Sequence, residues 1–159
     1  MARRGQSKPR KIIEDPVYKN KQVTKLINRA MKDGKKSIAQ KQVYGAFEII
    51  EKKTKKEALK VYLEALENIK PTMEVRPRRV GGAAYQIPMP VRGTRKDSLA
   101  IRWLITASRA RSNSDFHTFS DKLATEIIDA SNKEGGAVKK RQDIERMAEA
   151  NRAFAHFRW

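Results

Sequence analysis

Apolar side chains recur every three or four positions through residues 17–70, a stretch without proline. This spacing places the side chains on one face of an α-helix, whose interior excludes proline. The stretch therefore predicts three successive helices. Their inward faces are Val23, Leu26, Ile27, Ala30 and Met31; then Ala39, Val43, Ala46, Phe47 and Ile50; then Leu59, Tyr62, Leu63, Leu66 and Ile69.

Polar residues and glycine indicate where these helices begin and end. Asn20 is expected to cap the first helix, because its side-chain oxygen can accept a first-turn N–H, and Gly34 to end it. Ser37 and Thr54 each precede a Gln or Glu by three residues, which is the spacing of a capping box. We therefore expect the second helix to follow Ser37, the third to follow Thr54, and Pro71 to end the third.

Residues 72–91 replace the helical period by alternation. Met73 and Val75 alternate before Gly81-Gly82, and Ile87 and Met89 alternate after it. A period of two on both sides of a glycine turn predicts a β-hairpin. Because an isolated two-stranded hairpin is marginally stable in water, we expect it to lean on the domain or on a ligand.

The second long proline-free stretch, residues 91–159, predicts three more helices. The fourth helix, over about 97–111 with Asp97 as its cap, is apolar on most faces and is expected to be the central buried element. Ser114 is expected to cap the fifth helix, and the sixth covers about 137–151. The expected inward residues are Phe116, Phe119, Leu123 and Ile127 in the fifth helix, and Ile144, Met147 and Ala148 in the sixth.

These elements predict a mainly α fold, a single domain of about six helices with a protruding two-stranded β-hairpin between helices three and four. We divide the chain into a basic N-terminal arm (1–18), a helical domain (19–151) that includes the hairpin 72–91, and a C-terminal tail (152–159). The length of 159 residues suits one domain with a substantial core.

Charge indicates the kind of partner. The chain has 36 Lys and Arg against 18 Asp and Glu, and residues 1–36 (net +9) and 70–96 (net +6) hold most of the excess of +18. Cations concentrated in this way point to a polyanion such as a nucleic acid. The sequence has no run of about 20 apolar residues, so we expect no membrane partner.

Three basic elements are candidates for nucleic-acid contact: the arm, the lysines and arginines before helices two and four, and the hairpin. Arg95, Arg102 and Arg109 are seven residues apart, which aligns them along one stripe of the fourth helix. Arginine suits the role because its planar fork binds phosphate bidentately. The candidates are Arg3, Arg4, Lys8, Arg10, Lys11, Lys35, Lys36, Arg76, Arg78, Arg79, Arg92, Arg95, Lys96, Arg102, Arg109 and Arg111.

Each candidate also has a purely structural interpretation. The arm can be a solubilising tail, the lysines before the second helix can be linker residues, and the arginine stripe can be paired internally with acids. Tyr85 can stack on a base or pack on the ribbon. The excess of cations favours nucleic-acid binding for the set as a whole.

Residues for catalysis are not grouped in any familiar pattern. His117 and His156 have no cysteine partners for zinc, and the neighbouring Ser114, Asp115 and His117 lack a nucleophile-elbow sequence. We therefore expect no enzyme, metal, cofactor or small-molecule substrate.

Several short motifs together are highly specific. They are residues 33–37 (DGKKS), 65–68 (ALEN), 78–82 (RRVGG), 85–86 (YQ), 100–103 (AIRW), 137–141 (AVKKR), 147–151 (MAEAN) and 153–156 (AFAH). In their order and spacing the chain resembles the bacterial small-ribosomal-subunit protein seven family over essentially its whole length.

This resemblance implies a structural component of the small ribosomal subunit, in the ribosome of the cytoplasm. It implies a primary binder of the 3′ domain of the ribosomal RNA, which organises the head of the subunit. The hairpin tip is implied to lie near the exit tRNA site and the mRNA path: Val80, Gly81, Gly82, Ala83, Ala84 and Tyr85. The tail is implied to face neighbouring head and platform proteins through Phe154, His156, Phe157 and Trp159.

Three other functions compete with this interpretation. A DNA-binding protein would show the same net charge, and a protein-binding module would use the acidic fifth helix and the aromatic tail. An RNA-modifying enzyme would need a cofactor loop or an acid-base pair that the sequence lacks.

Overall fold

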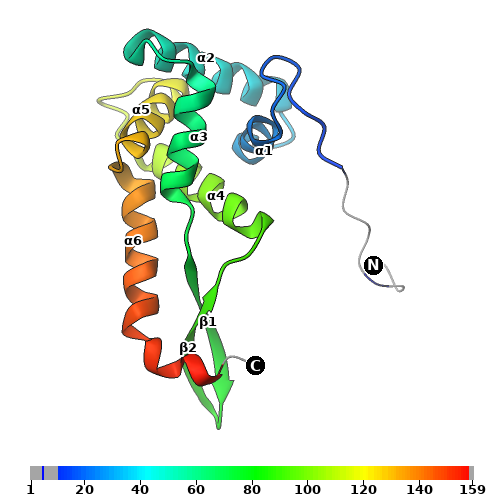
Figure 1. Ribbon diagram of the computed structural model, residues 1–159. Coiled ribbons are helices and arrows are strands. Elements are labelled where there is room, and N and C mark those ends of the chain that lie inside the picture. The colour runs from blue at the N-terminus through cyan, green and yellow to red at the C-terminus, as the bar shows by residue number, and fades with distance from the viewer. Residues whose placement is uncertain (1–4, 6–10, 158–159) are drawn as a thin grey trace.

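Six α-helices, a two-stranded ribbon and a short terminal 3₁₀ helix follow one another in the computed structural model, which describes Gly5 and residues 11–157 (Figure 1). This arrangement confirms the predicted mainly α fold with a hairpin between the third and fourth helices. The elements are α1 (Lys21–Ala30), α2 (Lys36–Thr54), α3 (Ala58–Ile69), β1 (Met73–Val80), β2 (Ala83–Pro90), α4 (Thr94–Ala110), α5 (Phe119–Ser131), α6 (Gly135–Ala150) and η1 (Arg152–Phe157).

Helix α4 is a central element of the core, as its apolar sequence predicts. It packs against α1, α3, α5 and α6, and α5 adds contacts to α2 and α3. Ala100 and Leu104 of α4 are fully buried, as are Phe47 of α2 and Tyr62 of α3. The apolar faces of the helices therefore meet around α4 and α5, and α4 is the helix that follows the ribbon in the chain.

The ribbon projects from the helical bundle (Figure 1). Its strands are antiparallel, with Met73 opposite Pro90 at the base and Val80 opposite Ala83 beside the turn. Gly81 and Gly82 have φ of +58° and +90°, a left-handed conformation that favours glycine and matches the twist of a two-residue hairpin turn. The predicted hairpin is thus confirmed, with its turn at Gly81-Gly82.

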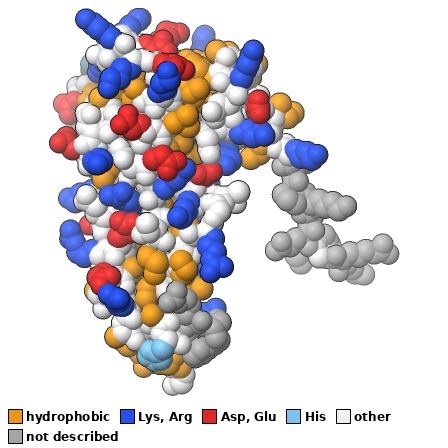
Figure 2. All heavy atoms as spheres, in the orientation of Figure 1, with side chains coloured by type: hydrophobic (Ala, Val, Ile, Leu, Met, Phe, Trp, Pro, Cys, Tyr) orange, Lys and Arg blue, Asp and Glu red, His pale blue; other side chains and the backbone are white. Residues whose placement is uncertain are grey.

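The C-terminal segment supports the ribbon. Helix η1 lies against β2, where the ring of Tyr85 is 5.2 Å from that of Phe154 and 5.6 Å from that of Phe157. Apolar side chains gather over this end of the molecule (Figure 2). Because aromatic pairs at these distances attract, the tail braces a ribbon that would be marginal alone.

Several predicted helix boundaries are wrong, although Asn20 does cap α1 by accepting the Gln22 N–H at 2.7 Å. Helix α1 ends at Ala30, before Gly34, and α2 begins at Lys36, before Ser37. Asp33 and Gly34 both have positive φ and form a tight turn. This turn allows the next helix to start at once, without a side-chain cap.

Three further predicted caps fail for similar reasons. Thr54 is the last residue of α2 and donates its hydroxyl hydrogen to the Ile50 carbonyl, while Lys55 ends the helix in the left-handed region. Thr118, and not Ser114, caps α5 through a reciprocal capping box. Asp97 lies inside the first turn of α4, whose N-cap is Gly93.

Two inward residues were also predicted wrongly: Phe116 is half-buried before α5, and Met147 is exposed on α6.

Candidate nucleic-acid interface

The arginine stripe of α4 exists, and its three members differ in what they contact. Arg102 is exposed and has no partner among the described residues. Arg109 is exposed and donates from Nη2 to the Ala30 carbonyl at 2.9 Å, which satisfies a free carbonyl at the end of α1. Arg95 pairs with an acid of the ribbon, Glu74. The internally paired interpretation therefore holds for one member of the stripe.

A hollow of about 440 Å³ lies at the base of the ribbon, lined by Arg76, Arg92 and Arg95 together with Met89 and Pro90. Ribbon, linker and helix each contribute one guanidinium group. Three forks around one hollow present many N–H donors in a small space, an arrangement suited to the oxygens of a phosphate backbone.

Glu74 lies beside this hollow and organises two of its arginines. Its Oε1 accepts from Arg76 Nε at 2.6 Å, and Arg95 Nε lies 2.9 Å from Oε1 and 2.8 Å from Oε2. Burial alone would raise the pKa of Glu74, but hydrogen bonds from Arg95 and Arg76 outweigh it and lower the pKa below its ordinary value. The carboxylate is therefore charged at neutral pH.

A second basic hollow, of about 260 Å³, lies where the α1–α2 turn meets the end of α4. Lys32, Lys35 and Arg109 line it. Lys35 precedes α2 without capping it, so the N–H groups of Ser37 and Ile38 have no acceptor among the described residues. A helix N-terminus with free N–H groups and flanking cations attracts an anion.

A third hollow, of about 470 Å³, lies along α1 and α4 and is lined by Ile12, Lys25, Asn28, Arg29, Thr94, Ser98 and Ile101.

The sequence analysis missed three cations that line the second and third hollows: Lys25, Arg29 and Lys32. Lys25 and Arg29 are four residues apart on the polar face of α1, and Lys32 follows in the turn after it, a spacing that could have found them. Lys25 is held by Asp97 at 3.0 Å, whereas Arg29 is exposed without a partner among the described residues.

Arg111 has a different environment from the other candidates. It donates from Nε and Nη2 to Glu126 Oε2 at 2.8 and 2.5 Å, and it also pairs with Asp129. Glu126 is 1% exposed and accepts the Ala137 N–H at 2.8 Å as well. Two carboxylates therefore neutralise this guanidinium inside the fold, where sequence reasoning expected a cation available to RNA.

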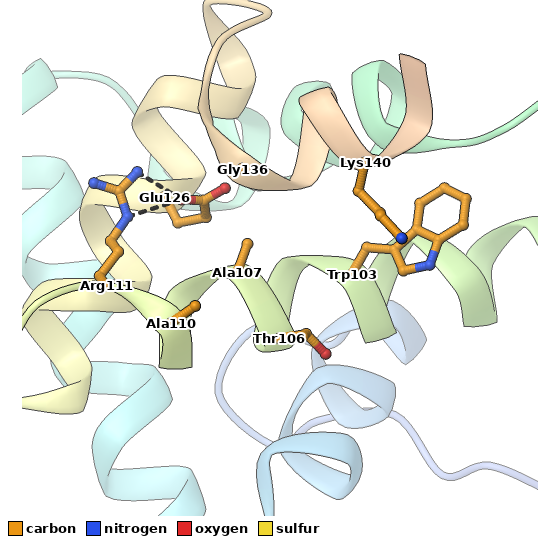
Figure 3. A pocket seen from close by; sticks show the side chains of 8 residues that line it. All are labelled: Trp103, Thr106, Ala107, Ala110, Arg111, Glu126, Gly136 and Lys140. Atoms are coloured by element: carbon orange, nitrogen blue, oxygen red, sulfur yellow. Dashed lines mark hydrogen bonds and ion pairs between the residues drawn. The ribbon is translucent and has the colours of Figure 1, made fainter. Parts of the chain in front are cut away.

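A hollow of about 430 Å³ lies beside this ion pair, lined by α4 and the start of α6 (Figure 3). Ala107 and Gly136 form its narrow middle, the Arg111–Glu126 pair lies at one end, and Trp103 and Lys140 lie at the other. Burial would lower the pKa of Arg111, but hydrogen bonds to Asp129 and Glu126 outweigh it and raise the pKa. The pair acts as an internal clasp between the end of α4, α5 and α6.

The remaining predicted residues belong to the ribbon, the tail, the arm and the first turns of α2 and α4. Arg78 is half-buried, Arg79 and Lys11 are exposed, Lys36 is exposed at the start of α2, and Lys96 is half-buried in α4. At the tip, Gly81, Gly82, Ala83 and Ala84 are exposed, and Val80 and Tyr85 are partly covered. Arg3, Arg4, Lys8, Arg10 and Trp159 lie outside the described residues.

Tyr85 packs on the tail, because the rings of Phe154 and Phe157 cover it. His156 stays exposed, with its Nδ1 at 2.8 Å from the Ala153 carbonyl oxygen. Two of the four tail residues expected to face a partner protein thus contact the chain's own ribbon.

The face over α3, α5 and α6 shows acidic and basic side chains interspersed (Figure 2). Acids of α5 are used internally: Asp121 completes the capping box with Thr118, and Glu126 and Asp129 hold Arg111. These contacts weaken the alternative in which α5 is an acidic surface that binds a partner protein.

Within the described ranges, no helix is long and apolar enough to cross a membrane, and no cluster of side chains has the composition of a metal site.

Comparison with known proteins agrees with this geometry. The family model described as ribosomal protein S7p/S5e matches residues 2–152. Relatives called small ribosomal subunit protein uS7, from Caldicellulosiruptor saccharolyticus and Caldicellulosiruptor bescii, are 60% identical over the full length of both chains. The relative of that name from Thermodesulfovibrio yellowstonii is 57% identical, also over the full length of both chains.

A match of this extent to a ribosomal family also answers the question of catalysis, because the family is not one of enzymes. The chain belongs to the ribosomal protein S7p/S5e family and is a small-subunit protein of the ribosome, which is cytoplasmic in bacteria and supplies ribosomal RNA and other ribosomal proteins as its partners.

Proposed function

We propose that this chain is a primary binder of the 3′ domain of the small-subunit ribosomal RNA and organises the head of the subunit. The observation that supports this proposal is the alignment of exposed cations with three hollows along α1 and α4, from the ribbon base to the start of α2. The cations come from segments far apart in sequence, so an RNA lying across them would touch several elements of the fold at once.

RNA recognition by this surface is expected to depend on shape and phosphate position. A-form RNA hides its base edges in a deep, narrow major groove, whereas its phosphates and 2′-hydroxyls are accessible. The hollows offer guanidinium and ammonium groups, which bind phosphate with little dependence on base sequence. Loss of one such cation should weaken binding to all cognate RNAs by a similar factor.

A pair of lysine variants tests the interface. Lys35→Ala removes a charge from the hollow before α2, and Lys52→Ala removes an equal charge from the exposed last turn of the same helix. We expect Lys35→Ala to weaken binding to a 3′-domain transcript and to reduce the slope of log affinity against log salt by about one. Lys52→Ala should change neither. Equal effects of the two variants would contradict the interface.

Competition distinguishes RNA from DNA as the partner. The proposal predicts that duplex DNA at the same salt concentration displaces the folded transcript only in large excess, because the cation surface is matched to the shape of the junction. Displacement by DNA mole for mole would instead support a DNA-binding protein.

The ribbon is proposed to reach the exit tRNA site and the mRNA path, because its exposed tip projects furthest from the bundle (Figure 1). The sequence contains no cysteine, so Ala83→Cys provides a unique attachment point for a cleavage probe at the tip. In reconstituted subunits the probe should cut exit-site tRNA, whereas the same probe on Ser114→Cys, exposed before α5, should not. If the probe fails to cut the tRNA from both positions, this placement is contradicted.

The C-terminal tail is proposed to face a neighbouring head or platform protein while it braces the ribbon. His156 is exposed, whereas Phe154 and Phe157 are partly covered by the ribbon, so His156→Ala should weaken that contact in assembled subunits and leave RNA binding unchanged.

A further inference from the structure

The ribbon base contains one acid in an otherwise basic segment. Glu74 is the single acid among residues 70–96, which hold seven Lys and Arg, and it is 7% exposed. A negative charge beside the hollow repels a phosphate by Coulomb's law, and burying it costs solvation energy. On charge alone, Glu74 is therefore expected to weaken RNA binding to this surface.

The contacts of Glu74 indicate what compensates for this disadvantage. Arg76 is two residues further along β1 and so shares its face of the strand, whereas Arg95 belongs to the first turn of α4. Arg95 approaches with Nε at 2.9 and 2.8 Å from the two carboxylate oxygens and with Nη2 at 2.8 Å from Oε2. One carboxylate thus holds two guanidinium groups that come from different elements.

Both arginines keep part of their hydrogen-bonding capacity for a ligand. Each guanidinium has five N–H donors, and the contacts with Glu74 use Nε and one terminal nitrogen of each. The side chains remain 47% exposed for Arg76 and 50% exposed for Arg95. Glu74 itself does not line the hollow, whereas both arginines do. The acid therefore holds the arginines from behind, and their outer donors face the hollow.

We propose that Glu74 is a positioning residue for the RNA interface, whose buried carboxylate holds Arg76 and Arg95 ready to bind one stretch of RNA backbone. A free arginine loses rotamer freedom when it binds a phosphate, and ordering it beforehand removes that cost from the binding step. This inference rests on the proposed RNA-binding function and adds to it an acid that strengthens binding to a polyanion.

The charge and the positioning explanations predict opposite changes in RNA affinity when Glu74 is replaced by glutamine. Glu74→Gln raises the net charge by one, so charge alone predicts tighter RNA binding. Loss of the charged acceptor releases two arginine side chains, and we expect affinity for the 3′-domain transcript to fall about threefold to tenfold. Unchanged or tighter binding by a folded Glu74→Gln protein would overturn the proposal.

Combining Glu74→Gln with arginine variants shows whether its effect on RNA affinity depends on Arg76 and Arg95. In an Arg76→Ala, Arg95→Ala background, Glu74→Gln should no longer weaken binding, because there is nothing left to position. In an Arg92→Ala background it should keep its full effect, because Arg92 lines the same hollow without contacting Glu74. Equal weakening by Glu74→Gln in both backgrounds would mean a general structural role and would contradict positioning.

A second variant keeps the test decisive if Glu74→Gln fails to fold. Glu74→Asp preserves the charge but shortens the side chain by one methylene, so its carboxylate should no longer reach the guanidinium groups of both Arg76 and Arg95. Positioning predicts weaker binding than wild type, and charge alone predicts equal binding. If the wild-type chain fails to bind the transcript, the proposed function itself fails. If wild type binds and Arg92→Ala weakens binding while both Glu74 variants leave it intact, only the positioning inference fails.

Discussion

Removal of the Arg111 side chain should destabilise the protein far more than removal of Arg102, although both arginines come from the same predicted helix, the fourth. Arg111→Ala leaves Glu126, 1% exposed, with the Ala137 N–H as its remaining donor among the described residues. An uncompensated buried charge of this kind costs about 3–5 kcal/mol. Folded domains have a total stability of about 5–15 kcal/mol, so this loss is a large fraction of the total.

Urea denaturation followed by circular dichroism measures this difference. We expect the free energy of unfolding to fall by about 3–5 kcal/mol for Arg111→Ala. Arg102→Ala removes an exposed side chain without a partner among the described residues, so its stability should stay within about 0.5 kcal/mol of wild type.

Two additional measurements distinguish loss of the ionic clasp from simple loss of side-chain packing. The double variant Arg111→Met, Glu126→Gln removes both charges and should recover much of the lost stability, because a neutral pair needs no ionic partner. Under conditions where Arg111→Ala is folded, its RNA affinity should match wild type, whereas Arg102→Ala should bind more weakly. A destabilisation below about 1 kcal/mol for Arg111→Ala would refute the assignment of this arginine to an internal clasp.

Two other features give independent predictions. Burial would raise the pKa of Asp97, but hydrogen bonds from Gln22, Lys25 and Lys70 outweigh it and lower the pKa. The charged carboxylate therefore stabilises the folded protein above the unfolded-state pKa of about 3.9. This stabilisation is lost as the pH falls through the lower pKa of the folded state. Asp97→Asn should therefore melt earlier than wild type at pH 7, with the difference shrinking in acid below about pH 4; a difference independent of pH would contradict this linkage. Phe154→Ala should speed amide exchange in β2 around Tyr85 and leave α4 unchanged, as measured by mass spectrometry, and unchanged exchange in β2 would show that the tail does not brace the ribbon.

Local chemistry accounts for most of the architecture that sequence reasoning predicted. Helical periodicity located all six helices because burial of one apolar face stabilises a helix at any position of a small domain. Alternation around Gly81-Gly82 predicted the ribbon because a two-residue turn requires residues that tolerate positive φ. The wrong helix ends have a local cause as well: turns at Asp33 and Lys55 use the left-handed region without glycine's sequence signal.

The amino-acid order thus established which elements form and which segments are basic, since both depend on neighbours within a few residues along the chain. It did not establish which arginines are available to RNA, because that depends on acids brought close by packing. Arg95 meets Glu74 across 21 positions and Arg111 meets Glu126 across 15, while Arg102 has no partner among the described residues. Charge patterning does not distinguish these arginines. The folded arrangement of α4 pairs Arg95 with an acid of the ribbon and Arg111 with acids of α5, and it leaves Arg102 exposed.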